Sequence, residues 1–516
     1  MNNRKIKVWP IIAASMFAGV MFATMGLIIK VVGLNILPVK YLGLAGLAVA
    51  FLLFLILCFF FLIPESAKSI VKYVVRLIGV LLSISLVLVD VVGIQMVNKF
   101  EETMHNVVEN IKPDENNKDE VVKVEEFIIG VYVLAEDKAE TLEDIKRYEF
   151  GYSLAYDRNN INKAINIVEN ELDRNIKLNE YNDIFYMVDR LLAEELDAFI
   201  LSNSYLDIIM EQEGYEDILS KIKCVYECKV TSETQVVERD ETEDSFDVTK
   251  DPFVVYISGH DVSFAAVRAN SDVNILAVVN PETKQILLVN TPRDFYVPIS
   301  LSKEGERDKL THCGIYGVEC SMDTLSDFYD VDINYYTQFN FTGFTRLIDA
   351  VGGISVYSEI SFYSTNEGIY FEQGWNDLNG AQALAFVRER KQFYGGDRAR
   401  GKHQMAVIKG VIEKMSSGSL LLNYASVLDS MGGYFRCGFT QDEIAALVKM
   451  QLNDLAEWNI KSFSVTGTGD YNTSYSLPGL ETYVMMPDMA SVKHAKKLIN
   501  MVYSNKTIEE EDLSYQ

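Results

Sequence analysis

The sequence predicts three membrane-spanning helices followed by two α/β domains, a small one and a larger one. Three long apolar runs lie within the first 98 residues, whereas a cleaved signal peptide would explain only one. Beyond them, strand-like and helix-like segments alternate in two blocks that an acidic stretch separates. The chain has 516 residues, which is enough for several hydrophobic cores.

The apolar runs have the length and composition of membrane spans. Residues 8–29 and 41–64 carry no charged side chain, and each is long enough to cross the hydrocarbon core as a helix. The third run covers about residues 77–97, with Asp90 as its only charge. An intramembrane carboxylate is either functional or satisfied locally, at the outer interface or by a neighbouring helix. The sequence leaves both interpretations of Asp90 open.

Basic residues predict the orientation of the spans. Three precede the first span and three lie between the second and third: Arg4, Lys5, Lys7, Lys68, Lys72 and Arg76. The loop between the first two spans has only Lys30 and Lys40 at its edges. The positive-inside rule then places the N-terminus in the cytoplasm and everything after about Lys99 outside the cell. Because ATP is scarce there, an activated lipid-linked donor is the natural energy source.

Charge is distributed very unevenly along the chain. The net charge is −26, but the first 100 residues hold nine basic and two acidic side chains. The remainder holds 38 basic and 71 acidic side chains, a net charge of −33. Such a surface repels nucleic acid and anionic headgroups, so no nucleic-acid partner is expected. An anionic substrate would have to meet a local basic cluster.

The first block after the membrane spans predicts a small α/β accessory domain. Phe127–Leu134 and Ala198–Leu201 resemble strands, while Ile161–Leu172 and Phe185–Leu192 have apolar residues at helical spacing. The stretch Thr231–Lys250 is acidic and poor in apolar residues, as linkers are. We therefore expect spans within 1–98, a stalk over 99–126, the accessory domain over 127–230, a linker over 231–251 and a catalytic domain over 252–510.

The second block has the pattern of a larger α/β domain. Phe253–Ile257, Val273–Val279 and Gln285–Asn290 are predicted strands. A turn is expected at Gly352-Gly353, and Met405–Met415 is predicted to be an amphipathic helix. The motifs that carry chemistry all lie in this block.

Two aspartates near predicted strand ends are candidate metal ligands. Asp261 follows the first strand of this block, and Asp272 immediately precedes the second. Magnesium commonly takes one or two carboxylates, with substrate phosphates and water as its other ligands. Turn and capping roles explain most such aspartates, so the pair alone is compatible with either role.

Two further motifs offer phosphate contacts. Arg293 follows a predicted strand end, where α/β folds place ligand-binding groups, and its planar fork suits a phosphate. A surface salt bridge with Asp294 is the alternative. Lys309 is a second candidate phosphate contact, and His312 could be an acid–base group or, more commonly for a lone histidine, structural.

The densest motif runs from Ala385 to Gln404. Ala385–Val387 resembles a strand, which would direct Arg388 and Arg390 to the same face. Arg400 and Gln404 lie four residues apart on the helix predicted next, so they also share a face. Basic groups from a strand and the following helix could converge on one diphosphate; otherwise they form a solvated basic face.

Six cysteines in a chain of this length do not make a disulfide scaffold. Cys224 and Cys228 lie in one strand-like stretch, and Cys313 and Cys320 flank Gly317. A disulfide is compatible with an extracellular location, but free buried thiols are the default expectation.

Six segments in one colinear order, over about residues 252–415, resemble the LytR-CpsA-Psr (LCP) family. These segments are SDVNIL, TPRDFYVPI, KLTHCGIYGV, DINYYTQFNFTGFTRLIDAVGGI, LNGAQALAFVRER and GDRARGKHQ. Three spans and an accessory domain before the catalytic one resemble CpsA-like members. The resemblance implies a mixed sheet flanked by helices in the extracellular domain.

The resemblance also implies roles for individual residues. The family's metal-binding aspartates correspond to Asp261 and Asp272, and the expected cofactor is Mg²⁺. The pyrophosphate-gripping and catalytic arginines correspond to Arg293, Arg388, Arg390 and Arg400, with Asp397 and Gln404 in support and Lys309 as a further contact. His403 departs from the pattern, because many members have an arginine there. The acceptor hydroxyl needs a base, and Asp397 and Asp294 are the available carboxylates.

The implied activity is a phosphotransfer in the cell envelope. Members of the family move a glycopolymer, such as a capsule or teichoic acid, from undecaprenyl pyrophosphate to peptidoglycan, which would make this chain a membrane-bound magnesium-dependent phosphotransferase. Capsule- or wall-assembly proteins are then candidate partners. The alternatives are a phosphohydrolase with the same arginine and magnesium site, and a non-catalytic regulatory or binding protein.

Overall fold

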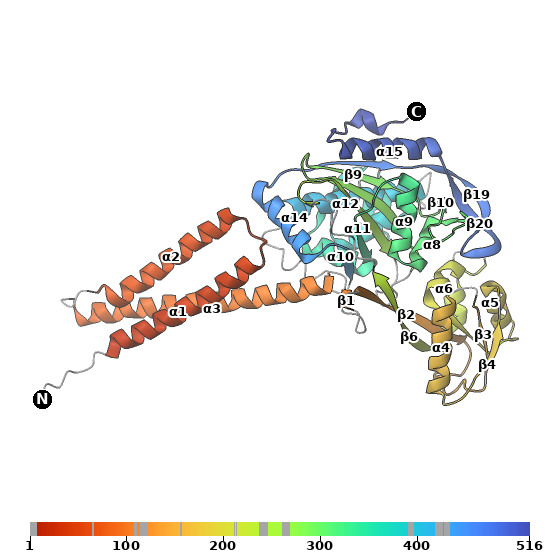
Figure 1. Cartoon of the computed structure of the whole chain (residues 1–516), viewed down its shortest axis with the longest axis horizontal. Coiled ribbons are helices and arrows are strands. Elements are labelled where there is room, and N and C mark those ends of the chain that lie inside the picture. The colour runs from red at the N-terminus through yellow and green to blue at the C-terminus, as the bar shows by residue number, and fades with distance from the viewer. Residues whose placement is uncertain are drawn as a thin grey trace. The chain divides into compact units, whose positions relative to one another are not determined.

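The computed structural model describes residues 8–63, 67–107, 111–113, 121–154, 157–210, 212, 214–236, 246–260, 269–390, 397–417, 427 and 434–515 (Figure 1). The chain divides into two compact units. The first comprises residues 1–108, 416–432 and 439–457, and the second comprises residues 109–415, 433–438 and 458–516.

The first unit contains three long apolar helices, as the sequence predicts. They are α1 (Val8–Gly33), α2 (Val39–Phe61) and α3 (Ser69–Val107). Each is long and apolar enough to cross a membrane. Only a few side chains, including Ala13, Ile56 and Phe60, are buried between them, and most of the others are exposed. Apolar helices with apolar exteriors are typical of membrane spans rather than of a water-soluble bundle.

Asp90 is satisfied locally within this unit. Its side chain is buried, and the Thr24 hydroxyl of α1 donates a hydrogen bond of 2.7 Å to its Oδ2 atom. A neighbouring helix therefore supplies a polar partner for this carboxylate, as the structural interpretation expects.

One helix from the C-terminal half of the chain belongs to the first unit. This helix, α14 (Gln441–Asp454), begins with a capping box formed by Thr440 and Glu443. The Lys449 side chain donates a 2.8 Å hydrogen bond to Asn35, in the loop between α1 and α2. Lys40 hydrogen bonds to the Asn453 carbonyl at the end of α14. The loop between the first two spans thus lies against α14.

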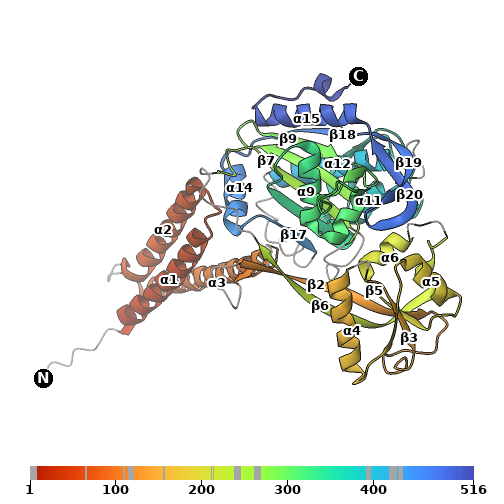
Figure 2. The same cartoon turned by 45° about the vertical axis from the view of Figure 1, so that its right-hand side comes forward.

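The accessory domain of the second unit is built on a mixed sheet in the order β1-β2-β5-β3-β4, with β6 also paired to β2 (Figure 2). Its strands are β1 (Ile111–Pro113), β2 (Val121–Leu134), β3 (Glu149–Tyr152), β4 (Lys177–Glu180), β5 (Ala198–Ser202) and β6 (Ile222–Val236). Its helices are α4 (Arg158–Glu171), α5 (Ile184–Leu192), α6 (Asn203–Met210) and α7 (Ile218–Lys221). The four predicted segments of this block are confirmed by β2, β5, α4 and α5. The predicted domain boundaries stay predictions.

The larger sheet of the second unit has the strand order β17-β12-β7-β8-β9-β18. Its strands are β7 (Phe253–His260), β8 (Val273–Asn280), β9 (Gln285–Asn290), β12 (Tyr335–Asn340), β17 (Phe435–Cys437) and β18 (Asn459–Ser464). Parallel pairs β7–β12 and β9–β18 and antiparallel pairs β7–β8, β8–β9 and β12–β17 make the sheet mixed. The three strands predicted in this block are confirmed.

Helices cover this sheet. Apolar side chains of α9 (Val318–Tyr329) and α15 (Met489–Tyr503) form one core with alternate residues of the central strands, and α15 lies beside β9 (Figure 2). The other helices are α8 (Leu310–Cys313), η1 (Gly314–Tyr316), α10 (Phe341–Ala350), α11 (Gly380–Arg388), α12 (Asp397–Ser416) and η2 (Glu510–Leu513). The expected glycine turn lies between α10 and β13 (Ile354–Ser358), where Gly352 and Gly353 have φ angles of 79° and 82°.

Short two-stranded elements surround the sheet. These are β10 (Tyr296–Pro298) with β11 (Arg307–Lys309), β13 (Ile354–Ser358) with β16 (Gly374–Leu378), β14 (Phe362–Tyr363) with β15 (Tyr370–Phe371), and β19 (Gly467–Ser474) with β20 (Leu477–Pro487).

The expectation that Ala385–Val387 is a strand is wrong. These residues lie in helix α11, which begins at a capping box between Asn379 and Gln382. Alanine, leucine and glutamine in its first turns favour a helix. This helix propensity outweighs the tendency of a short apolar run to form a strand.

All six cysteines are free thiols. Cys228, Cys313, Cys320 and Cys437 are buried, as expected, but Cys224 on β6 is exposed.

Candidate functional site: an arginine-lined cavity with apolar walls

A cavity of about 340 Å³ opens where the strands of the larger sheet end. Its charged and polar lining is Asp272, Thr365, Asn366, Arg388, Glu389, Arg390, Arg400 and Gln404. Its apolar lining is Val273, Phe339, Phe341, Phe344, Leu384, Val387 and Ile408. Of the nine predicted site residues, five therefore line one cavity: Asp272, Arg388, Arg390, Arg400 and Gln404. Strand ends are where α/β sheets commonly bind ligands.

Helix α12 contributes Arg400 and Gln404 from one face, as their spacing predicts. Both side chains are buried at the cavity. Gly401 lies against the Asn290 side chain at the end of β9, so closely that a Cβ atom there would overlap it. This close approach fixes the start of α12 against the sheet. Asp397 is the first residue of α12, but its side chain lies outside the part of the chain described here.

Arg388 and Arg390 reach the cavity from the C-terminal end of α11 rather than from a strand. Arg388 is the last residue of the helix, where a cation interacts favourably with the helix dipole. Its guanidinium lies 5.1 Å from the centroid of the Phe341 ring and 3.9 Å from a Glu367 oxygen. The intervening Glu389 is buried and accepts a hydrogen bond from the Thr365 backbone N–H. This hydrogen bond holds the chain after α11 in place, with Arg388 and Arg390 on either side of Glu389 and both lining the cavity.

Arg293 joins the cavity through Asp272. Its guanidinium forms an ion pair with the Asp272 carboxylate, and its Nε atom lies 3.6 Å from Asp294. All three side chains are partly buried, with 12%, 21% and 18% of their surface exposed. The Asp294 contact foreseen as an alternative is thus present, together with a second carboxylate at the cavity wall. Asp272 thus pairs with the guanidinium fork that could also engage a phosphate.

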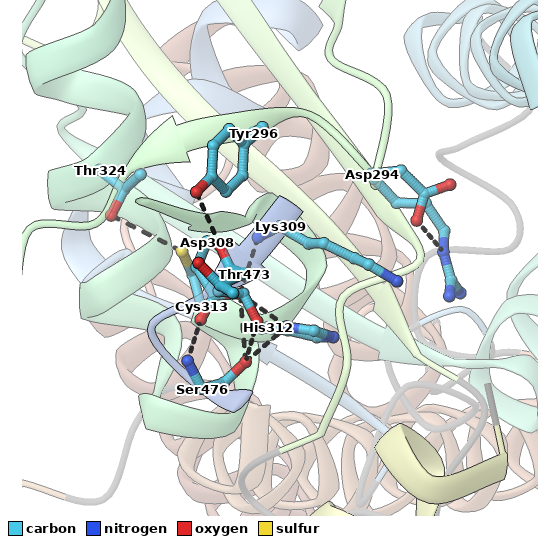
Figure 3. Close-up of polar contacts among 11 residues, drawn as sticks. Asp294, Tyr296, Asp308, Lys309, His312, Cys313, Thr324, Thr473 and Ser476 are labelled. Carbon is cyan, nitrogen blue, oxygen red and sulfur yellow. Dashed lines mark hydrogen bonds and ion pairs between the residues drawn. The ribbon is translucent and has the colours of Figure 1, made fainter. Parts of the chain in front are cut away.

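Backbone hydrogen bonds hold the segments that carry the remaining candidates. The Thr311 N–H donates to the Arg293 carbonyl at 2.8 Å, and the Thr311 carbonyl accepts from Ser271 at 3.0 Å. Lys309 is buried at the start of α8 and does not line the cavity. Figure 3 shows its side chain extending toward the side on which Asp294 lies.

His312 belongs to a buried polar node with Asp308 and Ser476 (Figure 3). Its Nδ1 atom lies 2.7 Å from Asp308 Oδ1 and 2.7 Å from Ser476 Oγ. The Ser476 N–H donates to the other Asp308 oxygen at 2.8 Å. In a Ser-His-Asp triad the serine and the aspartate contact opposite ring nitrogens. Here both contact Nδ1, so the node has the geometry of a structural tie between α8 and the β19–β20 turn.

His403 is neutral rather than an additional phosphate contact. Burial lowers its pKa to about 4. Its ring stacks on Phe362 at 5.3 Å with an interplanar angle of 10°, and lies 4.5 Å from the Phe386 ring. His403 therefore contributes an uncharged aromatic contact next to Gln404 rather than a charge at the cavity.

The metal expectation can be examined only at Asp272. Asp261 lies outside the described residues, which contain no cluster of three or more potential His, Cys, Asp or Glu ligands. Magnesium bound largely through substrate phosphates needs only one or two carboxylates. The Asp272 carboxylate at the cavity wall is a candidate for that role, so the described residues are compatible with a substrate-assisted magnesium ion.

Several lining residues were not foreseen. Phe339, Phe341 and Phe344 come from the end of β12 and the start of α10, and Thr365 and Asn366 come from the loop between β14 and β15. The three phenylalanines lie within a motif already singled out, and their density was an available signal. The loop residues become recognisable only once the chain is folded.

The three apolar helices and the cavity-bearing domain define a membrane-anchored α/β protein. A family model described as the LytR_cpsA_psr family matches residues 222–494, more than half of the chain. The chain belongs to this family, which confirms the resemblance seen in its motifs.

Similar proteins include transferases of teichoic acid. The chain is 36% identical over 203 residues to the polyisoprenyl-teichoic acid–peptidoglycan teichoic acid transferase TagU of Bacillus cereus, a match of 39% of this chain and 65% of that protein. It is 33% identical over 234 residues to TagU of Halalkalibacterium halodurans, covering 45% of this chain and 75% of the relative. The chain thus matches less than two thirds of the length of the first relative.

Solved structures show partial likeness. The crystal structure of B. subtilis TagV has a TM-score of 0.42 and 26% identity, covering 50% of this chain and 99% of that chain. TagT bound to LIIa-WTA has a TM-score of 0.42 and 26% identity, covering 52% and 97%.

Proposed function

We propose that this protein transfers a glycopolymer from a polyprenyl pyrophosphate carrier to peptidoglycan outside the cell membrane. The observation that carries the proposal is the composition of the cavity. Arg388, Arg390 and Arg400 line it together with apolar side chains such as Phe341 and Ile408. This lining matches a ligand with an anionic head and a hydrocarbon tail, because the arginines can bind the head and the apolar side chains can contact the tail.

The arginines suit the head of the donor. Planar guanidinium groups form paired, charge-assisted hydrogen bonds with phosphate oxygens. The residues after the first 100 carry a net charge of −33, so three arginines around one cavity depart sharply from their surroundings. The six apolar lining residues other than Val273 would contact the first isoprene units of the tail.

The reaction needs little covalent chemistry from the protein. The hydroxyl oxygen of the acceptor sugar attacks the phosphorus that carries the glycopolymer. The new O–P bond forms as the bridging P–O bond breaks, and polyprenyl phosphate leaves. The arginines orient the pyrophosphate and stabilise the charge that develops on its oxygens. The hydroxyl proton leaves to a base, for which Asp294 and Asp397 are the candidates.

We include magnesium in this proposal. Asp272 and Asp261 would hold it, and it would add positive charge at the phosphoryl oxygens. Asp272 also pairs with Arg293, whose guanidinium would contact the phosphate beside it.

The proposed topology has the cavity on the outer side of the membrane. Six basic residues lie before the first span and between the second and third, which favours a cytoplasmic location for those segments. Lys449 contacts Asn35 in the loop between α1 and α2, and Asn453 contacts Lys40 at the start of α2, as expected if this loop and α14 lie on the same side of the membrane. Protease added to intact protoplasts should therefore remove the C-terminal domains and leave a small membrane fragment.

The names of the relatives favour teichoic acid as the glycopolymer, and capsule or another wall polysaccharide fits the same chemistry. Purified full-length protein should convert a lipid-pyrophosphate-linked polymer and peptidoglycan into a covalent polymer–peptidoglycan product. If it released only free polymer to water, whatever acceptor was supplied, the protein would be a phosphohydrolase. If it produced neither, the transferase proposal would be wrong.

A further inference from the structure

One irregular hairpin, residues 354–378, displays aromatic side chains to solvent. Strand β13 pairs with β16, and the shorter pair β14–β15 continues the hairpin toward its tip. Tyr357 lies opposite Trp375, with ring centroids 5.6 Å apart, and Tyr363 lies opposite Tyr370 at 4.9 Å. We call these four residues the aromatic hairpin residues.

The aromatic hairpin residues are not part of a core. Between 51% and 68% of each is exposed. The buried side of the hairpin is formed by other residues: Ile354, Val356, Phe362 and Phe371. Single exposed apolar residues need no explanation, but two cross-strand aromatic pairs on one hairpin are typical of a binding surface.

The hairpin is attached to the cavity at its tip and along its length. Thr365 and Asn366, in the tip between Tyr363 and Tyr370, line the cavity. Phe362 stacks on His403 of α12, one residue before Gln404. Gly410 of the same helix lies against Ser355 in β13. The hairpin therefore packs against α12, the same helix that carries Arg400, so a ligand on the aromatic side chains would be bound close to the arginine cavity.

The charge of the hairpin indicates the kind of ligand. Between Ile354 and Leu378 the sequence has four carboxylates, Glu359, Glu367, Glu372 and Asp377, and no lysine or arginine. Glu359 pairs with Lys402 of α12, and Glu367 lies 3.9 Å from Arg388 at the cavity. Glu372 and Asp377 are exposed and flank Trp375 in the sequence, so the part of the hairpin around Trp375 repels anionic lipid headgroups. Aromatic faces pack against the C–H surfaces of sugar rings, and carboxylates and amides accept hydrogen bonds from hydroxyl groups.

We propose that the aromatic hairpin residues bind the uncharged sugar backbone of the acceptor glycan and guide it toward the cavity. Tyr357 and Tyr363 are six residues apart, and because the chain bends at Glu359 and Ile360, the two residues lie at most about 20 Å apart. The two aromatic pairs can thus contact different hexopyranose units of one strand, with other units between them. This inference rests on the proposed transferase function and assigns the acceptor side of that reaction.

The test uses full-length protein in nanodiscs with a lipid-pyrophosphate donor and soluble peptidoglycan glycan strands. In the double variant Trp375→Ala/Tyr363→Ala, the KM for the glycan strand should rise about tenfold, the scale typical of truncating aromatic contact residues. The kcat and the KM for the donor should stay within about twofold. The single variant Trp375→Phe keeps an aromatic ring, so its KM for the glycan strand should stay much closer to that of wild type than the KM of the double variant.

A matched control pair exists in the same unit. Tyr471 and Tyr483 lie opposite each other on β19 and β20, with 65% and 41% exposure. The variant Tyr471→Ala/Tyr483→Ala should leave the KM for the glycan strand unchanged. An unchanged KM in the hairpin variant, or an equal rise in the control, would overturn the proposal.

Direct binding separates this inference from the proposed function. A chitin tetrasaccharide should change the Trp375 fluorescence, measured as the difference between wild type and Trp375→Phe, even if no transfer is observed. Transfer by wild type with no tetrasaccharide binding would contradict the acceptor role alone. Quenching of Trp375 by brominated lipids in the nanodisc would instead assign the hairpin to the membrane surface.

Discussion

His403 should make the domain sensitive to acid. Its imidazole packs between Phe362 and Phe386, and burial lowers its pKa from 6.5 to about 4. The unfolded chain therefore binds a proton at this position between pH 6.5 and 4 that the folded chain does not. The stability that the neutral ring contributes is complete above pH 6.5 and is lost as the pH falls toward 4.

The size of the effect follows from the two pKa values. At pH 5 the protonation difference lowers the free energy of unfolding by about 2 kcal/mol, and at pH 4 by about 3 kcal/mol. For a domain of this size, about 2 kcal/mol corresponds to a fall in Tm of roughly 4–8 °C. Other groups also titrate in this range, so the informative quantity is the difference between wild type and a variant without the imidazole.

Two non-titrating variants of different size distinguish titration from packing. His403→Phe keeps a ring between Phe362 and Phe386, whereas His403→Gln does not. We expect both to lose less stability than wild type between pH 7.5 and 5, by about 2 kcal/mol, although their Tm values at pH 7.5 will differ. Thermal unfolding of the detergent-solubilised protein, followed by near-ultraviolet circular dichroism, measures this. If both variants lost as much stability as wild type, the assignment of the pKa shift to burial of His403 would be refuted.

Three further changes test other parts of the structure. Asp272→Asn should abolish most of the transfer and lower the free energy of unfolding by about 1–3 kcal/mol, because Arg293 loses the closer of its two carboxylate partners. An unfolding curve and activity like those of wild type would contradict this. Ser476→Ala should lower the free energy of unfolding by about 1–3 kcal/mol, because it removes hydrogen bonds to buried Asp308 and His312. A Tm unchanged from wild type would show that these hydrogen bonds do not stabilise the domain. In the folded C-terminal domains, Ellman's reagent should label Cys224 alone, since Cys228, Cys313, Cys320 and Cys437 are buried; rapid reaction of a second thiol there would disagree with the described packing.

The sequence predicted most of the cavity because local patterns determine its parts. Continuous apolar runs identified β7, β8 and β9, whose ends place Asp272 and Arg293 at one edge of the sheet. The four-residue spacing of Arg400 and Gln404 gave their common face correctly. Arg388 and Arg390 line the cavity together with Arg400, but the predicted reason is wrong, since they follow from helix α11 and not from a strand. The capping box at Asn379 and Gln382 was the overlooked signal.

What the sequence did not predict depends on contacts between distant residues. Ser476 lies 164 residues from His312, and only the folded chain shows that it occupies the Nδ1 side of that ring. The pairing of Arg293 with Asp272 likewise depends on neighbouring strand ends. Thr365 and Asn366 have no motif of their own and reach the cavity because an irregular hairpin carries them there.

The central claim is that the cavity holds the pyrophosphate head of a polyprenyl carrier. It is tested most directly by equilibrium binding of a short-chain polyprenyl pyrophosphate to full-length Arg400→Lys and Arg388→Lys variants. Lysine keeps the charge but not the paired hydrogen bonds, so each variant should bind about tenfold more weakly or worse than wild type. Arg346→Lys, on an exposed arginine that stacks on Tyr434 away from the cavity lining, should bind like wild type. Wild-type affinity in both cavity variants, or an equal loss in all three, would contradict the assignment of the cavity.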